Sequence, residues 1–220
     1  MIDLEPARRA LLDSALSHIP FDGWTNKSLA AAARETELSA ETMARAFPGG
    51  VAGLAAFFSA EFDRRMADAL AAQDLDAMPV RARIAAAVRA RLELLAPHKE
   101  AVRRLAAYSA MPGRGFAAVR AALATVDAIW RAAGDSATDF NYYTKRGLLA
   151  PVYGATLLYW LSDETDGSKE TWAFLDRRIA GVLKIPAIQG RILRLAGRIP
   201  TPPGILKRLR KRLKTAKVMT

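Results

Sequence analysis

The sequence contains no cysteine and only two histidines, which removes several classes of chemistry. Without cysteine there is neither a disulfide scaffold nor a zinc–thiolate site, and a reducing compartment is compatible with the chain. His18 and His98 lie on separate predicted helices, and no Glu-x-x-His pair offers the ligands of a di-iron bundle. We therefore expect no metal, no cofactor and no catalytic residue; an active site built from carboxylates alone is the weaker alternative.

Long apolar runs are also missing. None reaches the length of a membrane-spanning helix, and the acidic N-terminus lacks the basic and apolar regions of a signal peptide. Strand-like alternation is nearly absent, whereas apolar residues recur at intervals of three and four, which predicts an all-α fold. Proline, glycine and capping residues divide this pattern into about nine helices, near 6–19, 26–36, 39–47, 51–73, 80–95, 98–110, 114–133, 140–162 and 168–184.

The predicted divisions are an N-terminal part, residues 1–50, a helical domain, residues 51–185, and a tail, residues 186–220. Three prolines should shape the helices: Pro20 should end the first, Pro151 should kink the eighth, and Pro186 should separate the ninth from the tail.

Basic charge is concentrated at the C-terminal end. Residues 184–220 carry 11 basic residues and no acidic residue, whereas residues 1–78 carry 7 basic and 12 acidic residues. At about 100° per residue, apolar side chains of the tail share a narrow arc with arginines along one flank. This predicted membrane-binding set is Ile188, Arg191, Ile192, Arg194, Leu195, Arg198 and Ile199. Such a helix suits an anionic membrane surface, where each cation contributes about 1 kcal/mol.

Two other interpretations of the tail are a nucleic-acid arm and a solvated end, but neither requires an apolar stripe at helical spacing. The second basic segment, residues 205–217, has no assigned role.

The first seventy residues have the proportions of a helix-turn-helix protein, with two short helices around a tight turn and a long fourth helix. The segments that resemble the N-terminal domain of TetR-type repressors are Thr25-Asn26-Lys27, Leu38-Ser39, Met43 and Phe47. The residues that depart from that pattern at the turn and at the DNA contacts are Glu37, Glu41, Ala44 and Gly50. Because this part is also acidic, we expect no specific nucleic-acid binding, and a divergent TetR-type regulator is the alternative function.

Two later segments are distinctive: Asp139-Phe140-Asn141-Tyr142-Tyr143-Thr144-Lys145-Arg146 and Thr171-Trp172-Ala173-Phe174-Leu175-Asp176-Arg177-Arg178. Both closely resemble motifs of the Coq-nine family of ubiquinone (coenzyme Q) biosynthesis accessory proteins, in which tryptophan often stands at the position of Tyr142. The resemblance implies a TetR-like bundle that does not regulate transcription and that holds a cavity for prenyl or quinone-like lipids. It also implies a surface for the di-iron hydroxylase of the pathway and an amphipathic C-terminal helix that docks on a membrane.

Motif matching places the hydroxylase contact at the aromatic pair, so the predicted partner-binding residues are Tyr142, Tyr143, Lys145 and Arg146. The predicted lipid-binding residues are Phe58, Phe62, Met66, Leu92, Leu105, Phe116, Leu123, Ile129, Leu148 and Val152. From the residues alone such side chains would simply fill a core, and only the family resemblance favours a cavity.

These expectations combine into one functional hypothesis. The chain is a non-catalytic, homodimeric lipid-binding protein, cytoplasmic and peripheral on the inner face of the plasma (inner) membrane. It takes a prenylated quinone precursor from the membrane and presents it to the hydroxylase.

Overall fold

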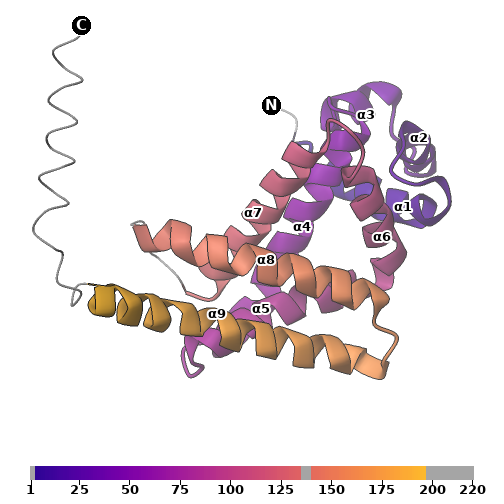
Figure 1. Cartoon of the computed structure of the whole chain (residues 1–220). Coiled ribbons are helices and arrows are strands. Elements are labelled where there is room, and N and C mark those ends of the chain that lie inside the picture. The colour runs from indigo at the N-terminus through magenta and orange to yellow at the C-terminus, as the bar shows by residue number, and fades with distance from the viewer. Residues whose placement is uncertain (1–2, 135–139, 197–220) are drawn as a thin grey trace, which may run out of the picture. The chain divides into compact units, whose positions relative to one another are not determined.

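The computed structural model describes residues 3–134 and 140–196, and within the second range it describes the side chains of residues 145–182. These residues form nine α-helices and two short 3-10 helices, without a strand, which confirms the predicted all-α class (Figure 1). The helices are α1 Glu5–Asp22, α2 Asn26–Glu35, α3 Ala40–Ala46, α4 Val51–Ala71, α5 Val80–Leu95, η1 Ala96–His98, α6 Lys99–Ser109, α7 Gly115–Ala132, α8 Phe140–Ser162, η2 Asp166–Ser168 and α9 Lys169–Ala196. The chain divides into two compact units, residues 1–180 and 181–220, and α9 contributes to both.

Two prolines do not end their helices where the sequence pattern predicted. α1 continues past Pro20 to Asp22, and the Gly23 N–H then donates to the Ile19 carbonyl. α9 continues through Pro186 to Ala196. The physical reason is that a proline removes one intrahelical donor, a cost that neighbouring turns can absorb, so it bends or ends a helix according to context.

The first three helices have the expected local signals. Thr25 caps α2 through a reciprocal capping box with Ser28, and the Ser39 hydroxyl accepts from the Thr42 N–H at 3.1 Å to cap α3. Between them, Glu37 adopts a left-handed backbone with φ of 55°, at the turn position where the sequence pattern lacked its usual glycine. Local side-chain chemistry therefore fixes this helix-turn-helix shape.

The N-terminal part and the helical domain share one core. The Trp24 indole N–H donates to the Ala101 carbonyl of α6 at 2.9 Å, and its ring packs edge-on against Phe58 of α4 at 5.3 Å between centroids. Residues 1–50 are thus joined to the later helices by buried contacts.

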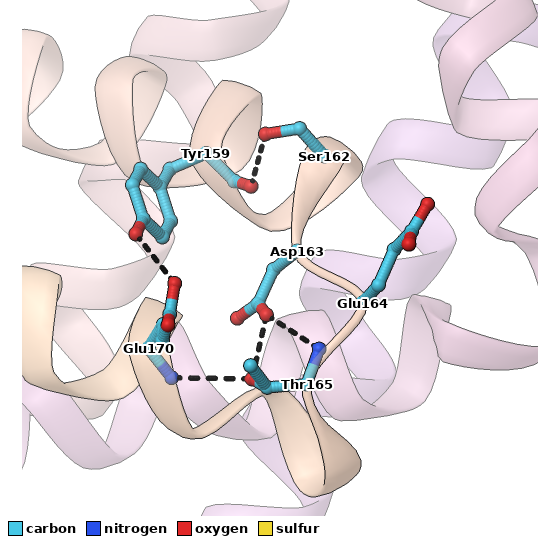
Figure 2. A pocket seen from close by; sticks show the side chains of 6 residues that line it. All are labelled: Tyr159, Ser162, Asp163, Glu164, Thr165 and Glu170. Carbon is cyan, nitrogen blue, oxygen red and sulfur yellow. Dashed lines mark hydrogen bonds between the residues drawn. The ribbon is translucent and has the colours of Figure 1, made fainter.

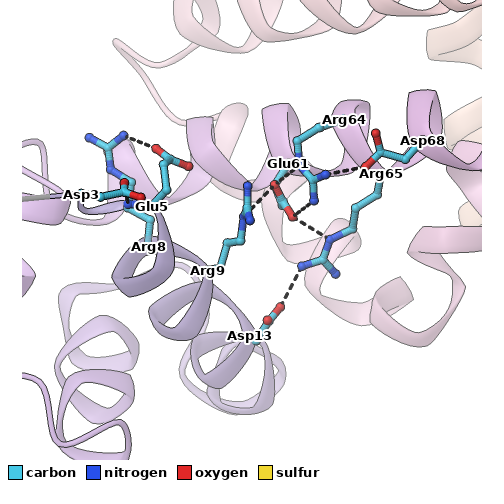
Figure 3. A network of polar contacts seen from close by, with 9 residues as sticks. All are labelled: Asp3, Glu5, Arg8, Arg9, Asp13, Glu61, Arg64, Arg65 and Asp68. Carbon is cyan, nitrogen blue, oxygen red and sulfur yellow. Dashed lines mark hydrogen bonds and ion pairs between the residues drawn. The ribbon is translucent and has the colours of Figure 1, made fainter.

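A charged network also joins α1 to α4 (Figure 3). The Glu61 side chain is only 3% exposed and accepts hydrogen bonds from Arg64 at 2.8 and 2.9 Å and from Arg65 at 2.9 Å. Arg65 also donates to Asp13 of α1 at 3.1 Å, and Arg9 of α1 lies 3.7 Å from Glu61. The hydrogen bond from Arg64 is the main cause that lowers the pKa of Glu61 to about 2, so this carboxylate stays charged.

The core of the first unit centres on α4, which packs against α5 and α7, while α8 packs on α7 (Figure 1). The largest fully buried side chains are Trp160, Phe58, Phe62, Leu11, Leu12, Ile19, Leu54, Met66, Leu70, Leu92, Leu95 and Ile129. The candidate site lies among these helices.

Candidate functional site

A buried polar cluster lies inside the helical domain, with one residue from each of four helices. The Arg91 guanidinium of α5 donates to Asp63 Oδ1 of α4 and to the Tyr153 hydroxyl of α8, both at 2.6 Å. The Thr125 hydroxyl of α7 donates to Asp63 Oδ2 at 3.0 Å. Among the described residues, no buried side-chain nitrogen or oxygen lacks a hydrogen-bond partner.

The electrostatics of this cluster favour the pairing of its members with one another. Burial raises the pKa of the Asp63 carboxyl, and the Arg91 guanidinium opposes that rise by favouring the carboxylate. Burial also raises the pKa of the Tyr153 hydroxyl, so the phenol stays neutral and accepts from Arg91. Because every group is already paired within the cluster, its hydrogen bonds connect α4, α5, α7 and α8 and fix their relative positions.

The structure places six of the predicted lipid-binding residues in the packed interior on these same four helices: Phe58, Phe62, Met66, Leu92, Ile129 and Val152. Leu105 and Leu148 are half-buried. Phe116 and Leu123 are not brought to the others, because 83% and 45% of their surfaces are exposed. A lipid role for this set stays a prediction.

A pocket of about 440 Å³ lies where α8, η2 and α9 meet (Figure 2). Its lining is Tyr159, Ser162, Asp163, Glu164, Thr165 and Glu170, which includes none of the predicted lipid-binding residues. Although burial opposes it, hydrogen bonds from Thr165 and Thr171 hold the pKa of the Asp163 carboxyl well below its usual range. This carboxylate therefore caps the start of α9, and the polar lining does not suit a prenyl chain.

The described ranges contain neither a metal-binding cluster nor a membrane-spanning helix. No group of three or more His, Asp or Glu side chains there could hold a metal ion. No helix within residues 3–134 and 140–196 has the length and apolarity needed to cross a bilayer.

The predicted partner-binding residues lie at the start of α8. The side chains of Tyr142 and Tyr143 lie outside the described residues. The Lys145 ammonium lies 5.3 Å from the ring centroid of Trp130, and the indole of Trp130 donates to the Lys145 carbonyl at 3.3 Å.

The Arg146 side chain is nearly buried, and its Nε donates to Asp127 of α7 at 2.6 Å. Arg146 therefore positions the first turns of α8 against α7. Asp127 was not among the residues predicted from the sequence, although it is the only carboxylate of α7 and lies three residues before Trp130.

The predicted membrane-binding residues Ile188, Arg191, Ile192, Arg194 and Leu195 fall in the helical backbone of α9, and their side chains lie outside the described residues. Arg198, Ile199 and the segment 205–217 lie wholly outside them. The helical backbone supports the periodicity on which the stripe depends, while the membrane contact itself stays a prediction.

The outer face of α3 carries the residues that differ from a DNA reader. Glu41 and Ala44 are exposed, and the Glu41 carboxylate lies 4.0 Å from Arg45, the basic residue on the same helix. An exposed carboxylate at this position would repel a DNA phosphate, and the absence of specific DNA binding stays a prediction.

The chain is similar in sequence to proteins named for ubiquinone biosynthesis. The COQ9 family model matches residues 116–186. The ubiquinone biosynthesis protein COQ9, mitochondrial, of Drosophila melanogaster is 31% identical over 181 residues, which are 80% of this chain and 55% of that protein. The proteins of the same name from rat and human are 30% and 29% identical over 182 residues, covering 80% of this chain and 58% and 57% of their own lengths. The chain therefore spans a little more than half the length of these curated relatives.

A solved structure shares the fold. The TetR transcriptional regulator from Nitrosomonas europaea superposes with a TM-score of 0.66 and 20% sequence identity, over 81% of this chain and 99% of that chain. The predicted TetR-like architecture is thus confirmed, as a statement about fold alone.

The predicted location on the inner face of a plasma membrane is wrong, because the curated relatives are named mitochondrial proteins. The physical reason for the error is that cations and an apolar stripe recognise anionic lipid as such. Those features carry no information about which membrane supplies the lipid.

Proposed function

Because the chain is a sequence relative of the COQ9 family of ubiquinone biosynthesis proteins, as its two motifs predicted, we propose that it is a lipid-binding accessory protein of that pathway. It takes a prenylated quinone precursor from an anionic membrane surface and presents it to a di-iron hydroxylase. The observation that carries the proposal is the 31% identity to a COQ9 protein over 80% of the chain. Both motif segments, residues 139–146 and 171–178, fall within the match to the family model.

The proposed lipid site is the buried apolar stripe on α4, α5, α7 and α8. A prenyl chain is insoluble in water, and burying it in the protein is favourable by about 25 cal/mol for each Å² of apolar surface removed from water. Since the side chains fill this interior, lipid entry requires a local separation of these helices away from the Arg91 cluster, and the bound lipid would stabilise that open state. The cluster around Arg91 then holds the four helices together beside the occupied site.

The proposed hydroxylase contact is the start of α8. Aromatic side chains next to cations are typical of the centres of protein interfaces. The pairing of Arg146 with Asp127 and the packing of Lys145 on Trp130 fix the backbone that follows Tyr142 and Tyr143 in the chain. In the same proposal the tail anchors the protein to anionic lipid, and the protein acts as a homodimer without catalytic activity of its own.

We expect organic extracts of the purified protein to contain prenyl lipid when it is produced in cells that make ubiquinone. Val152 is buried on α8 and Leu158 is exposed on the same helix, which provides a matched pair. Val152→Trp should lower the lipid content by filling the site, at a stability cost of about 1–3 kcal/mol, whereas Leu158→Trp should leave it unchanged. Mass spectrometry measures the lipid; extracts without prenyl lipid above background would contradict the proposal.

We further expect Tyr142→Ala/Tyr143→Ala to weaken association with the hydroxylase about tenfold or more, since interface aromatics carry much of the binding energy. Tyr108→Ala, a half-buried tyrosine on α6, is the control. Calorimetry measures the affinity for the hydroxylase, and the melting temperature measures stability. Together they distinguish a partner contact, which changes the affinity alone, from a core residue, which changes the stability. If the double variant unfolds or aggregates, the pair belongs to the core and is not a partner contact.

A further inference from the structure

The start of α7 and the turn before it expose an unusual concentration of apolar side chains. Of the seven large apolar side chains exposed in the described residues, four lie between positions 111 and 123: Met111, Phe116, Val119 and Leu123. Three of them, Phe116, Val119 and Leu123, recur at helical spacing and share the face of α7 opposite Thr125 and Ile129, which are buried. We call these four residues the α7 outer face.

The stretch of chain that carries the α7 outer face is basic and contains no acidic residue. From residue 101 to residue 126 the sequence has four arginines and no aspartate or glutamate. Arg103 and Arg104 pair with Glu100 within α6, whereas Arg114 and Arg120 form no ion pair with any carboxylate of the described residues. The Arg114 guanidinium lies 3.7 Å from the Tyr108 ring centroid and donates to the Met111 sulfur at 3.2 Å, beside the apolar patch.

We propose that the α7 outer face, together with Arg114 and Arg120, is a second membrane-docking surface that inserts into anionic lipid independently of the tail. Apolar side chains flanked by cations suit the two outer regions of an anionic bilayer. The apolar groups enter the boundary of the acyl chains, and the cations lie among the headgroups. The inference goes beyond the lipid-carrier role, since it concerns where the protein body contacts the bilayer.

Charge complementarity favours lipid over a second copy of this chain as the occupant. A twofold interface brings the same patch of both subunits together. At the α7 outer face it would oppose Arg114 and Arg120 to their own copies, with no acidic residue between positions 101 and 126 to compensate them. Anionic lipid supplies the missing negative charge.

The absence of cysteine allows a direct test. Phe116 and Phe21 are matched positions, with 83% and 84% of their surfaces exposed on different helices. In the full chain, Phe116→Cys and Phe21→Cys are each labelled with an environment-sensitive nitrobenzoxadiazole fluorophore. On vesicles of phosphatidylglycerol and phosphatidylcholine in equal parts, emission from position 116 should shift to the blue and brighten, and emission from position 21 should not. An unchanged spectrum at 116 would overturn the proposal.

A second measurement compares vesicle partitioning of two double variants. Phe116→Ser/Leu123→Ser should weaken partitioning about tenfold, because two apolar side chains lose their insertion, while the control Phe21→Ser/Leu158→Ser stays as wild type. Both double variants are also made in a chain that carries Ile192→Ser/Leu195→Ser in the tail. The vesicle binding that remains in this chain should again depend on positions 116 and 123. Added salt should weaken wild-type binding without abolishing it, because screening acts only on the charges.

The remaining outcomes identify other occupants. Unchanged partitioning with conversion of a dimer to a monomer by light scattering would assign the face to a second copy and reject the lipid surface. Unchanged partitioning with loss of hydroxylase association would assign it to that partner and likewise reject it. The lipid-carrier proposal is tested separately, by the prenyl lipid content of the extracts. Failure of one proposal can therefore be distinguished from failure of the other.

Discussion

Replacing Arg91 with methionine should lower the free energy of unfolding by about 3–5 kcal/mol, the largest stability effect that we expect of a single substitution in this chain. The guanidinium is buried and holds both Asp63 and Tyr153 at 2.6 Å. Removing it leaves the Asp63 carboxylate in the core without its counter-charge, and methionine cannot satisfy the Tyr153 hydroxyl. Four helices meet at this cluster, so the loss should appear as global unfolding.

The matched control is Arg89→Met, two positions away on the solvent side of the same helix. Arg89 is exposed and pairs with Glu93, so its loss should cost no more than about 1 kcal/mol. Urea unfolding followed by circular dichroism measures both variants. Arg91→Met/Asp63→Leu should recover much of the lost stability, because no unpaired charge then remains. A loss below about 1 kcal/mol for Arg91→Met would show that the cluster does not hold the helices together.

Acidification should lower the free energy of unfolding by about 2 kcal/mol through protonation of Glu61. This is less than the difference between the folded and unfolded pKa of Glu61 would give, because Arg64 is half-exposed and water screens the pair. The folded pKa of about 2 lies below the ordinary value of 4.5, so the folded state binds fewer protons than the unfolded chain. The contribution is therefore complete above pH 4.5 and is lost as the pH falls towards 2.

Urea unfolding of wild type and Glu61→Gln across this pH range measures the effect as a difference between the two curves. The difference should be largest near neutral pH and should shrink on acidification. Glu100→Gln is the control, since Glu100 pairs with Arg103 and Arg104 on the surface of a single helix and should have a much smaller effect. Parallel curves for wild type and Glu61→Gln would contradict a role for this carboxylate in joining α1 to α4.

The sequence by itself determined the helical class, the approximate helix positions and the similarity to COQ9 proteins. Capping residues such as Thr25 and Ser39 act on neighbouring backbone groups, so their effect can be predicted locally. The two motif segments predicted the similarity to COQ9 proteins. A motif of adjacent residues can be recognised in the sequence without knowledge of the tertiary structure. The basic tail was equally visible, because net charge needs no tertiary information.

Only the tertiary structure decided which apolar face of α7 is covered. Phe116 and Ile129 both belong to apolar rows of one helix, yet the first is exposed and the second is buried. Periodicity specifies that side chains share a face, but burial depends on which neighbour packs there. The same limit hid the pairs of Arg91 with Asp63 and of Arg146 with Asp127, since residues 28 and 19 positions apart meet only when their helices pack together.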